Sequence, residues 1–270
     1  MIEPFRVTRS LSVVISAMLL ASGLCGCQTA ATPDVTGSLG DKAGSGRAAD
    51  PRREVEASQS RFQTSPKDPE AALQYGKALR GAGQRAQAVA VLERATIAQP
   101  GNKALLAGYG RALLDNGNFQ QAFDVLGRAH TPDDPDWRIL SAQGAALDQL
   151  GRYDEARQYY ASALKIAPDD PSVLSNLGLS YLLSKDLLKA EETLRSAYGH
   201  AGTDPRVRAN LALAVGLQGR MAEAEKIAKA DLPPEEGAAN VAQLKQLLSR
   251  QGNSRAEVDK IPIAAAARSQ

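Results

Sequence analysis

Aromatic residues are scarce in this chain of 270 residues, at 4% of the total, and their scarcity constrains the fold. Sheets are enriched in aromatic and β-branched side chains, whereas alanine and leucine supply most of the apolar content here. A core built from small side chains suits closely packed helices. The composition therefore predicts an all-α fold.

The chain also lacks an excess of charge of one sign and has few cysteines. Its 32 basic and 30 acidic residues leave a formal net charge of +2, so no global field would recruit nucleic acid or acidic substrates. Both cysteines, Cys25 and Cys27, precede the predicted folded body, which excludes a disulfide framework or a cysteine-based metal site there. Stability must therefore come from packing.

Motifs of catalytic and cofactor chemistry are missing as well. His130 and His200 have no His, Cys or acidic partners at metal-site spacing, and we expect both at the surface. Gly81-Ala82-Gly83 and Gly44-Ser45-Gly46 lack the lysine and the flanking strand and helix of a phosphate-binding loop, and no nucleophile elbow is present. We therefore expect no enzymatic activity, no cofactor, no metal, no small-molecule substrate and no nucleic-acid partner.

The N-terminus has the pattern of a targeting segment. Arg6 and Arg9 precede an apolar stretch from Leu11 to Leu24, which small residues follow, as in a secretory signal peptide. The apolar stretch of ~14 residues is shorter than the ~20 that a membrane-spanning helix needs. This favours a cleaved signal peptide at residues 1–26 over an uncleaved anchor.

The segment Leu24-Cys25-Gly26-Cys27 resembles a bacterial lipobox, in which a cysteine receives a diacylglycerol and the chain is cut before it. The resemblance makes Cys27 the lipidated first residue of the mature chain, although a cysteine at the second lipobox position departs from the usual pattern. Two or more acyl chains would give a stable membrane anchor. Gln28 is no inner-membrane retention signal, which implies the cell envelope and the periplasmic face of the outer membrane.

Residues 27–66 are rich in Gly, Ala, Ser, Thr, Asp and Pro and show almost no apolar periodicity. This composition predicts a disordered linker behind the lipidated cysteine. A flexible chain of this length would span ~35 Å root-mean-square. Only a weak signal for a short helix lies within it, from Arg52 to Phe62.

Small residues return every 34 positions in the following segment, residues 67–250. The two series are Gly76, Gly110, Gly144 and Gly178, and Ala88, Ala122, Ala156 and Ala190. This period resembles that of tetratricopeptide (TPR) repeats, helical hairpins that bury their apolar faces by stacking. Five units would then start at Pro69, Lys103, Trp137, Pro171 and Pro205.

The repeat predicts how each hairpin is built and where the stack ends. The glycine and alanine series allow the two helices of a unit to approach closely, and the turns between them carry Gly83, Gly117, Gly151 and Gly219. Lys185 in the fourth turn predicts a strained or differently built turn. The fifth unit is degenerate, and Pro233-Pro234 precede a capping helix with Val241, Leu244 and Leu248 on one face. Residues 251–270 are predicted to be a disordered tail.

A TPR α-solenoid implies a groove, because in this family the first helices line the concave face of a right-handed superhelix and hold a peptide or partner helix. The corresponding positions are Leu73, Lys77, Arg80, Arg111, Leu114, Ser175, Asn176, Leu179, Leu182, Asn210 and Leu213. The groove would be basic at one end and apolar at the other, and an exposed apolar stripe often marks an interaction site.

Several of these residues also fit other roles. Asn176 and Asn210 suit either a ligand backbone or a place beside the core. The three basic residues fit a solvated face better than contact with a ligand, and Trp137 fits packing between units better than contact with a partner.

The lipobox, the polar linker, the five TPR units and the segment Asp231-Leu232-Pro233-Pro234 leading into Asn240-Val241-Ala242-Gln243-Leu244 together resemble the TadD family of tight-adherence (Flp) pilus assembly lipoproteins. The likeness covers most of the mature chain, but only its C-terminal segment is more specific than TPR repeats in general. Members of that family look like pilotins, so the resemblance implies a non-enzymatic scaffold that helps a pilus secretin to localise and assemble. The alternatives are a TPR adaptor for outer-membrane protein insertion or cell-wall synthesis and, with less support, an envelope hydrolase.

Overall fold

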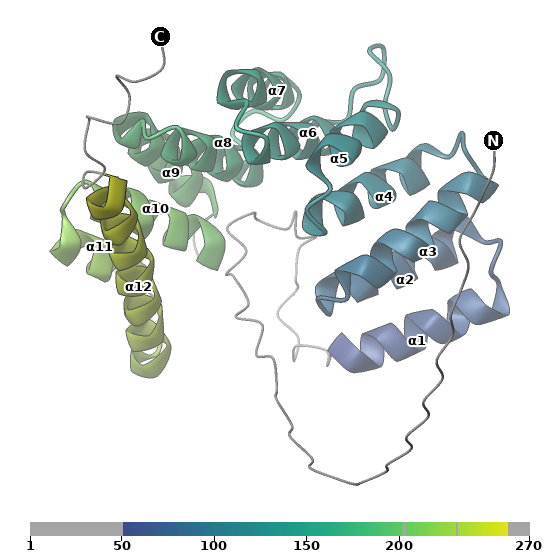
Figure 1. The fold of residues 1–270 in the computed structure, drawn as a ribbon, viewed down its shortest axis with the longest axis horizontal. Coiled ribbons are helices and arrows are strands. Elements are labelled where there is room, and N and C mark those ends of the chain that lie inside the picture. Colours follow the sequence, from purple (N-terminus) through teal and green to yellow (C-terminus); the bar gives the residue numbers. More distant parts are fainter. Residues whose placement is uncertain (1–50, 202–203, 231, 259–270) are drawn as a thin grey trace, which may run out of the picture. The chain divides into compact units, whose positions relative to one another are not determined.

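Helices connected by short turns make up the part of the chain that the computed structural model describes, residues 51–201, 204–230 and 232–258 (Figure 1). The helices are α1 (Pro51–Thr64), α2 (Pro69–Gly81), α3 (Arg85–Ala98), α4 (Lys103–Asp115), α5 (Phe119–Gly127), α6 (Trp137–Gln149), α7 (Tyr153–Ile166), α8 (Pro171–Leu183), α9 (Leu187–Ala201), α10 (Pro205–Leu217), α11 (Met221–Ala228) and α12 (Pro234–Val258). These described residues include no strand, only an isolated bridge between Thr131 and Asp134. The all-α prediction is confirmed.

The first helix of each unit begins at the residue that the repeat predicted and is 13 residues long. A capping residue explains this regularity, because an aspartate or asparagine precedes each first helix and its side chain accepts a hydrogen bond from a backbone N–H of the first turn. The caps are Asp68, Asn102, Asp136, Asp170 and Asp204. These caps are a second sequence signal, besides the period, for where each first helix begins.

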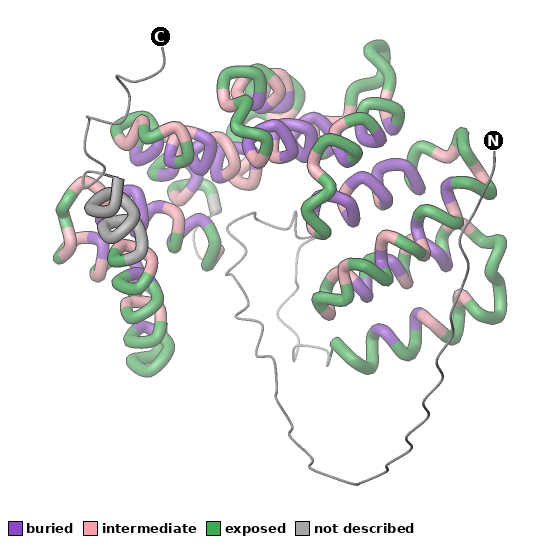
Figure 2. Tube along the Cα trace, in the orientation of Figure 1, coloured by how far each residue is buried: buried purple, intermediate pink, exposed green. Residues whose placement is uncertain are grey.

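Within a unit, a glycine of the first helix accommodates one large side chain of the second. A Cβ at Gly178 would lie 2.5 Å from Leu194 Cγ, which is too close for any side chain. The same pairing joins Gly76 with Leu92, Gly110 with Leu126 and Gly144 with Tyr160. The alanine series is fully buried beside these contacts, as predicted (Figure 2). In the fifth unit both positions hold a buried alanine. Ala212 replaces the glycine of the first helix, and Ala228 replaces the large side chain of the second, so the loss of volume in one compensates for the gain in the other.

The helices form two layers. Each first helix contacts the first helix of the next unit, from α2 through α4, α6 and α8 to α10. The second helices α3, α5, α7 and α9 contact the first helices on either side, but in the described part of the chain they do not contact one another. We call the layer formed by α2, α4, α6, α8 and α10 the first-helix layer.

Four of the five turns within units place a glycine in the left-handed region, at φ values from 73° at Gly83 to 85° at Gly117. The fourth turn places Lys185 there, at φ 64°. Its hydrogen bonding is unchanged: Lys185 N–H donates to Leu182 O at 3.0 Å, as Gly83 N–H does to Arg80 O. Of the two predicted possibilities, the turn is therefore built in the usual way and the lysine carries the strain.

The prediction of a disordered linker over residues 27–66 is wrong for its last part, because α1 spans Pro51–Thr64 and packs on α2. Val55 and Ser58 are buried, and the ring of Phe62 stacks on Tyr75 with centroids 5.6 Å apart. α1 begins 34 residues before α3, and both helices have 14 residues. It is therefore the second helix of an incomplete unit that covers one end of the stack.

At the other end, α12 begins at Pro234 as predicted and covers the fifth unit. Leu244 is buried, and Val241 and Leu248 pack against the same apolar cluster. The helix continues to Val258, so the predicted boundary at residue 250 lies too early. The predicted signal peptide, Cys27 and the final residues 259–270 lie outside the described part of the chain.

Candidate protein-binding face

The first-helix layer carries all of the residues predicted to bind a partner. Leu73, Lys77 and Arg80 lie on α2, and Arg111 and Leu114 on α4. Ser175, Asn176, Leu179 and Leu182 lie on α8, and Asn210 and Leu213 on α10. Because these helices contact one another in order, the structure brings the predicted residues into one layer.

Four of the five leucines in this set are buried, and Leu73 is half-buried. Leu114, Leu179, Leu182 and Leu213 expose only 7–9% of their surface. Leu114 belongs to one apolar core cluster, and Leu179, Leu182 and Leu213 belong to another. The expectation of an exposed apolar stripe made of these leucines is therefore wrong, and their burial stabilises the stack.

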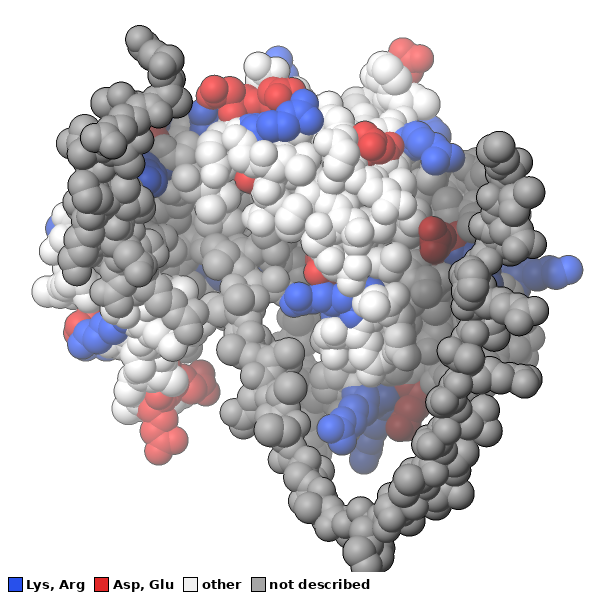
Figure 3. All heavy atoms as spheres, viewed as in Figure 1, with Lys and Arg blue, Asp and Glu red and all other residues white. Residues whose placement is uncertain are grey.

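The basic end of the predicted groove is less positive than expected. Arg80 Nε donates to Asp115 Oδ2 at 2.5 Å, and the two side chains are 14% and 19% exposed. This ion pair joins α2 to α4 and offsets the charge of Arg80. Lys77 is exposed and Arg111 half-buried. On the face drawn in Figure 3, basic and acidic side chains lie near one another and form no large field of one sign.

The two asparagines form hydrogen bonds between units. Asn176 Nδ2 donates to Ser141 Oγ at 3.1 Å, and Asn210 Nδ2 donates to Ser175 Oγ at 3.3 Å. The first bond joins α8 to α6 and the second joins α10 to α8. Both asparagines remain partly exposed. Their amides thus have a structural partner, in line with a place beside the core.

A buried carboxyl group on α6, that of Asp148, was not predicted from the sequence. Asp148 accepts hydrogen bonds from Tyr160 Oη at 2.8 Å and from Ser180 Oγ at 2.6 Å. Burial raises the pKa of Asp148 to about 6, although both hydrogen bonds and the charge of Arg157 oppose the shift. Burial, together with the carboxylate, raises the pKa of Tyr160 well above its usual value.

A sequence signal for this contact existed. Asp148 stands where the neighbouring units have Leu114 and Leu182, and Tyr160 stands where they have Leu126 and Leu194. Two polar groups at otherwise apolar core positions of one unit predict that the groups are partners, because a buried polar atom needs one.

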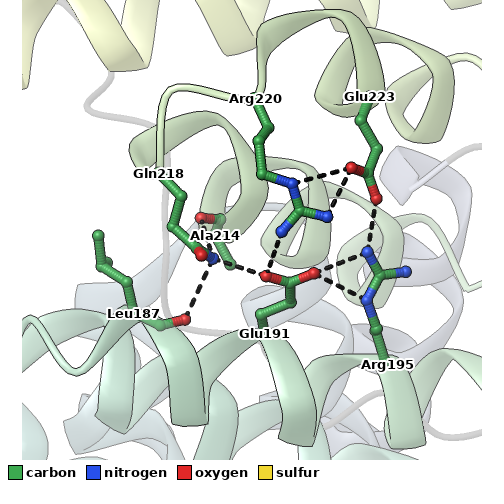
Figure 4. Close-up of polar contacts among 7 residues, drawn as sticks. All are labelled: Leu187, Glu191, Arg195, Ala214, Gln218, Arg220 and Glu223. Atoms are coloured by element: carbon green, nitrogen blue, oxygen red, sulfur yellow. Dashed lines mark hydrogen bonds and ion pairs between the residues drawn. The ribbon is translucent and has the colours of Figure 1, made fainter.

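An ion-pair network joins the fourth unit to the fifth (Figure 4). Glu191 of α9 accepts from Arg195 Nε at 2.8 Å, Gln218 Nε2 at 2.8 Å and Arg220 Nη1 at 2.7 Å. Glu223 of α11 accepts from the same two arginines. Burial favours a higher pKa for Glu191, but the hydrogen bonds outweigh it and lower the pKa. The network therefore holds a charged carboxylate at the contact between units.

The two histidines and the single tryptophan were also considered as candidate functional residues in the sequence. His130 is half-buried with Nε2 3.1 Å from Gln143 Oε1, so the expectation that it lies at the surface is wrong, whereas His200 is exposed as predicted. Trp137 packs against the apolar cluster around Tyr160, and the Arg138 guanidinium lies 4.3 Å from its ring centroid.

The described residues contain neither a candidate metal site nor a membrane-spanning helix. Nowhere in residues 51–201, 204–230 and 232–258 do three or more His, Cys, Asp or Glu side chains come together in a way that could hold a metal ion. Within the same residues, none of the helices has the length and apolar character needed to cross a bilayer.

Comparison with known proteins agrees with this architecture. Residues 79–144 match the family described as "Tetratricopeptide repeat", and residues 144–184 match the family described as "TPR repeat". The comparison with curated proteins found no match.

Solved structures share the fold at low sequence identity. TTC0263, a TPR protein of Thermus thermophilus, is 20% identical with a TM-score of 0.54, and the match covers 60% of this chain and 88% of that one. PilW, described as a widely conserved type IV pilus biogenesis factor, is 18% identical with a TM-score of 0.59, covering 72% and 91%. A chain of the APC/C hetero-tetramer Cut9–Hcn1 is 16% identical with a TM-score of 0.60, covering 74% and 39%. Residues 79–184 thus match tetratricopeptide repeat models, and the described part of this chain has the fold of a TPR-like stack of helical hairpins.

Proposed function

We propose that this protein is a lipid-anchored TPR scaffold that binds a protein partner and helps a Flp pilus secretin to localise and assemble at the outer membrane. The observation that carries the proposal is the continuous first-helix layer from α2 to α10, because TPR stacks bind proteins along this layer. Such a role needs a rigid surface rather than a reaction centre.

The finer parts of the proposal have separate support. The lipobox ending at Cys27 supports an envelope location, and the segment from Asp231 to Leu244 supports a pilus role through its resemblance to TadD proteins. The fold is also similar to that of PilW, which is described as a pilus biogenesis factor.

Recognition on this layer would depend on its exposed and half-buried side chains, because four of its five predicted leucines are buried. Lys77 and Arg111 could meet acidic groups of a partner, and Asn176 and Asn210 could meet its backbone. An anchor on Cys27 would keep the layer near the membrane and raise its effective concentration for an assembling secretin.

Photo-crosslinking in cells tests where the partner binds. A crosslinkable residue placed at Lys77 or Asn176 should capture the secretin, whereas one placed at Glu192, an exposed position on second helix α9, should not. Deletion of the gene should reduce secretin multimers in the outer membrane. Normal multimers in the deletion strain would refute the pilotin role.

The same crosslinking experiment also tests the alternative function, a TPR adaptor for another envelope machine. Capture of a component of outer-membrane protein insertion or of cell-wall synthesis, in place of the secretin, would favour a TPR adaptor for that machine. Equal capture from Lys77 and Glu192 would contradict binding on the first-helix layer.

The anchor is tested by cell fractionation. Cys27→Ala should release the folded protein from the membrane, whereas Cys25→Ala should leave it anchored, because only Cys27 occupies the lipidated position. Retention of the Cys27→Ala protein in the membrane fraction would refute lipidation as the anchor.

A further inference from the structure

The turn between α8 and α9 carries exposed apolar side chains. Leu188 is 75% exposed and Leu183 is 36% exposed, and Lys185 between them is also exposed. The corresponding turns of the other four units have glycine where this turn has Lys185.

Lys185 occupies the left-handed region, at φ 64°, where a residue with a Cβ is strained and glycine is not. The turn has the same hydrogen bonds as the glycine turns, so the lysine adds nothing to its closure. Strained residues are often kept for function. The reason for a lysine at this position therefore lies in its side chain and not in its backbone.

Hydrogen bonds connect the fourth turn to the units on either side of it. Arg157 of α7 donates to Ser184 Oγ at 3.1 Å, and Gln218 donates to Leu187 O at 3.3 Å, which joins the third and fifth units to the fourth turn. Leu150, in the turn of the third unit, is 36% exposed.

The charge of the fourth turn is positive. Lys189 Nζ lies 3.0 Å from Asp186 Oδ2, so these two charges offset each other. The charge of Lys185 remains, between two exposed leucines. We call Leu150, Leu183, Lys185 and Leu188 the leucine edge.

We propose that the leucine edge contacts the surface of a phospholipid bilayer with anionic headgroups. Exposed leucines beside a lysine suit such a surface, because the apolar side chains enter the boundary of the acyl region while the ammonium group pairs with a phosphate.

The distance to the proposed anchor permits this contact. Between Cys27 and Pro51 lie 23 residues, which reach at most ~80 Å when fully extended. This step rests on the proposed lipidation of Cys27. The leucine edge would then set which side of the stack faces the membrane and leave the first-helix layer open to a partner.

Lysine footprinting on vesicles tests the contact. The mature chain from Cys27 has this cysteine alone, so its thiol can be coupled to a maleimide lipid whether or not cells lipidate it. The vesicles would contain phosphatidylethanolamine with about one third phosphatidylglycerol, and acetylation of each lysine would be followed by mass spectrometry. Lys165, exposed near the end of α7 at the opposite edge, is the internal reference.

We expect acetylation of Lys185 to slow at least fivefold relative to Lys165 on anionic vesicles, and less on phosphatidylcholine vesicles. Leu183→Ser with Leu188→Ser should abolish the protection. Ile97→Ser, at a 75% exposed position near the end of α3, should keep it.

Equal acetylation of Lys185 and Lys165 on anionic vesicles would overturn the proposal. So would protection of Lys185 that arises only when a protein partner is added. Because coupling is chemical, a failure here leaves the Cys27→Ala fractionation and the crosslinks to judge the proposed function independently.

Discussion

Single residues set how closely the two helices of a unit approach each other. Gly76 and its equivalents Gly110, Gly144 and Gly178 have no space for a Cβ, because a large side chain of the second helix fills it. Gly199 of α9, by contrast, has nothing within 4 Å of such a Cβ. The two kinds of glycine therefore predict opposite effects of the same substitution.

Gly178→Ala should destabilise the protein by about 1–3 kcal/mol, because the added methyl group overlaps Leu194 in a packed core. Gly199→Ala should be neutral or stabilising by up to about 1 kcal/mol, since alanine favours a helix over glycine. Chemical denaturation followed by circular dichroism measures both. A similar stability for the two variants would contradict the packing described for Gly178.

Lys185→Gly should stabilise the fold by about 1 kcal/mol, because glycine adopts the left-handed conformation without strain. The reciprocal change Gly151→Lys should destabilise it by a similar amount, since Gly151 has φ 75° in the equivalent turn. Both free energies of unfolding come from the same denaturation experiment. Loss of stability in Lys185→Gly would show that the lysine supports the turn, contrary to its unchanged hydrogen bonding.

At the scale of helices, units are joined by polar contacts as well as by apolar packing. The side chains of Asp148, Tyr160 and Ser180 link α6, α7 and α8 through two buried hydrogen bonds. The network around Glu191 links α9 to the turn between α10 and α11 and, through Arg195 and Glu223, to α11 itself. Of these groups, Asp148 is the one whose pKa is shifted toward neutral pH.

The stability that Asp148 contributes should depend on pH. Its pKa is raised from 3.8 to about 6 by burial, with opposition from Ser180, Tyr160 and Arg157, so the folded state binds the proton more tightly than the unfolded state. The contribution is then complete below the unfolded pKa and is lost as pH rises through the folded pKa. As the pH rises from about 4 to about 7.5, the free energy of unfolding of the wild type should fall by about 2–3 kcal/mol relative to that of Asp148→Asn.

Urea titrations of both proteins across this pH range measure the difference. Carboxylates with lowered pKa values, such as Glu191 and Glu223, are common to both proteins and cancel in the comparison. Parallel pH profiles would show that the carboxyl group of Asp148 does not titrate in this range.

For the molecule as a whole, the elements that follow the 34-residue period were predicted more completely than those that depart from it. The starts of the first helices were predictable because Gly76 and its equivalents recur in strict phase. α1 was only weakly indicated, as a short helix from Arg52 to Phe62, because Glu54 and Ser58 stand where α3 has Ala88 and Leu92, which removes the apolar pattern although the helix still packs on α2.

The binding face was harder to predict than the fold. The period places Leu179 and Leu213 on the first-helix layer, but it does not tell whether the next unit covers them, and both are buried. The contact between Asp148 and Tyr160 was predictable in principle, because the neighbouring units have leucine at both positions. Exposure depends on how successive units pack, and the phase of the repeat does not contain that information.

Truncation at α12 tests whether the stack is stabilised unit by unit. In repeat proteins each unit contacts only its neighbours, so loss of a terminal helix weakens the adjacent unit first. A chain ending at Leu232 loses the packing of Val241 and Leu244 on the fifth unit, and of Leu248 over Gly216. Hydrogen exchange should therefore quicken most in α10 and α11, less in α8 and α9, and hardly at all in α2 to α5.

The matched control for this truncation ends at Val258 and keeps the whole of α12. It should exchange like the full chain in every helix from α1 to α11, because the packing of α12 on α10 and α11 is intact. Uniform loss of protection from α2 to α11 in the shorter chain would mean instead that the whole stack unfolds as one cooperative unit, and that α12 stabilises distant repeats as strongly as adjacent ones.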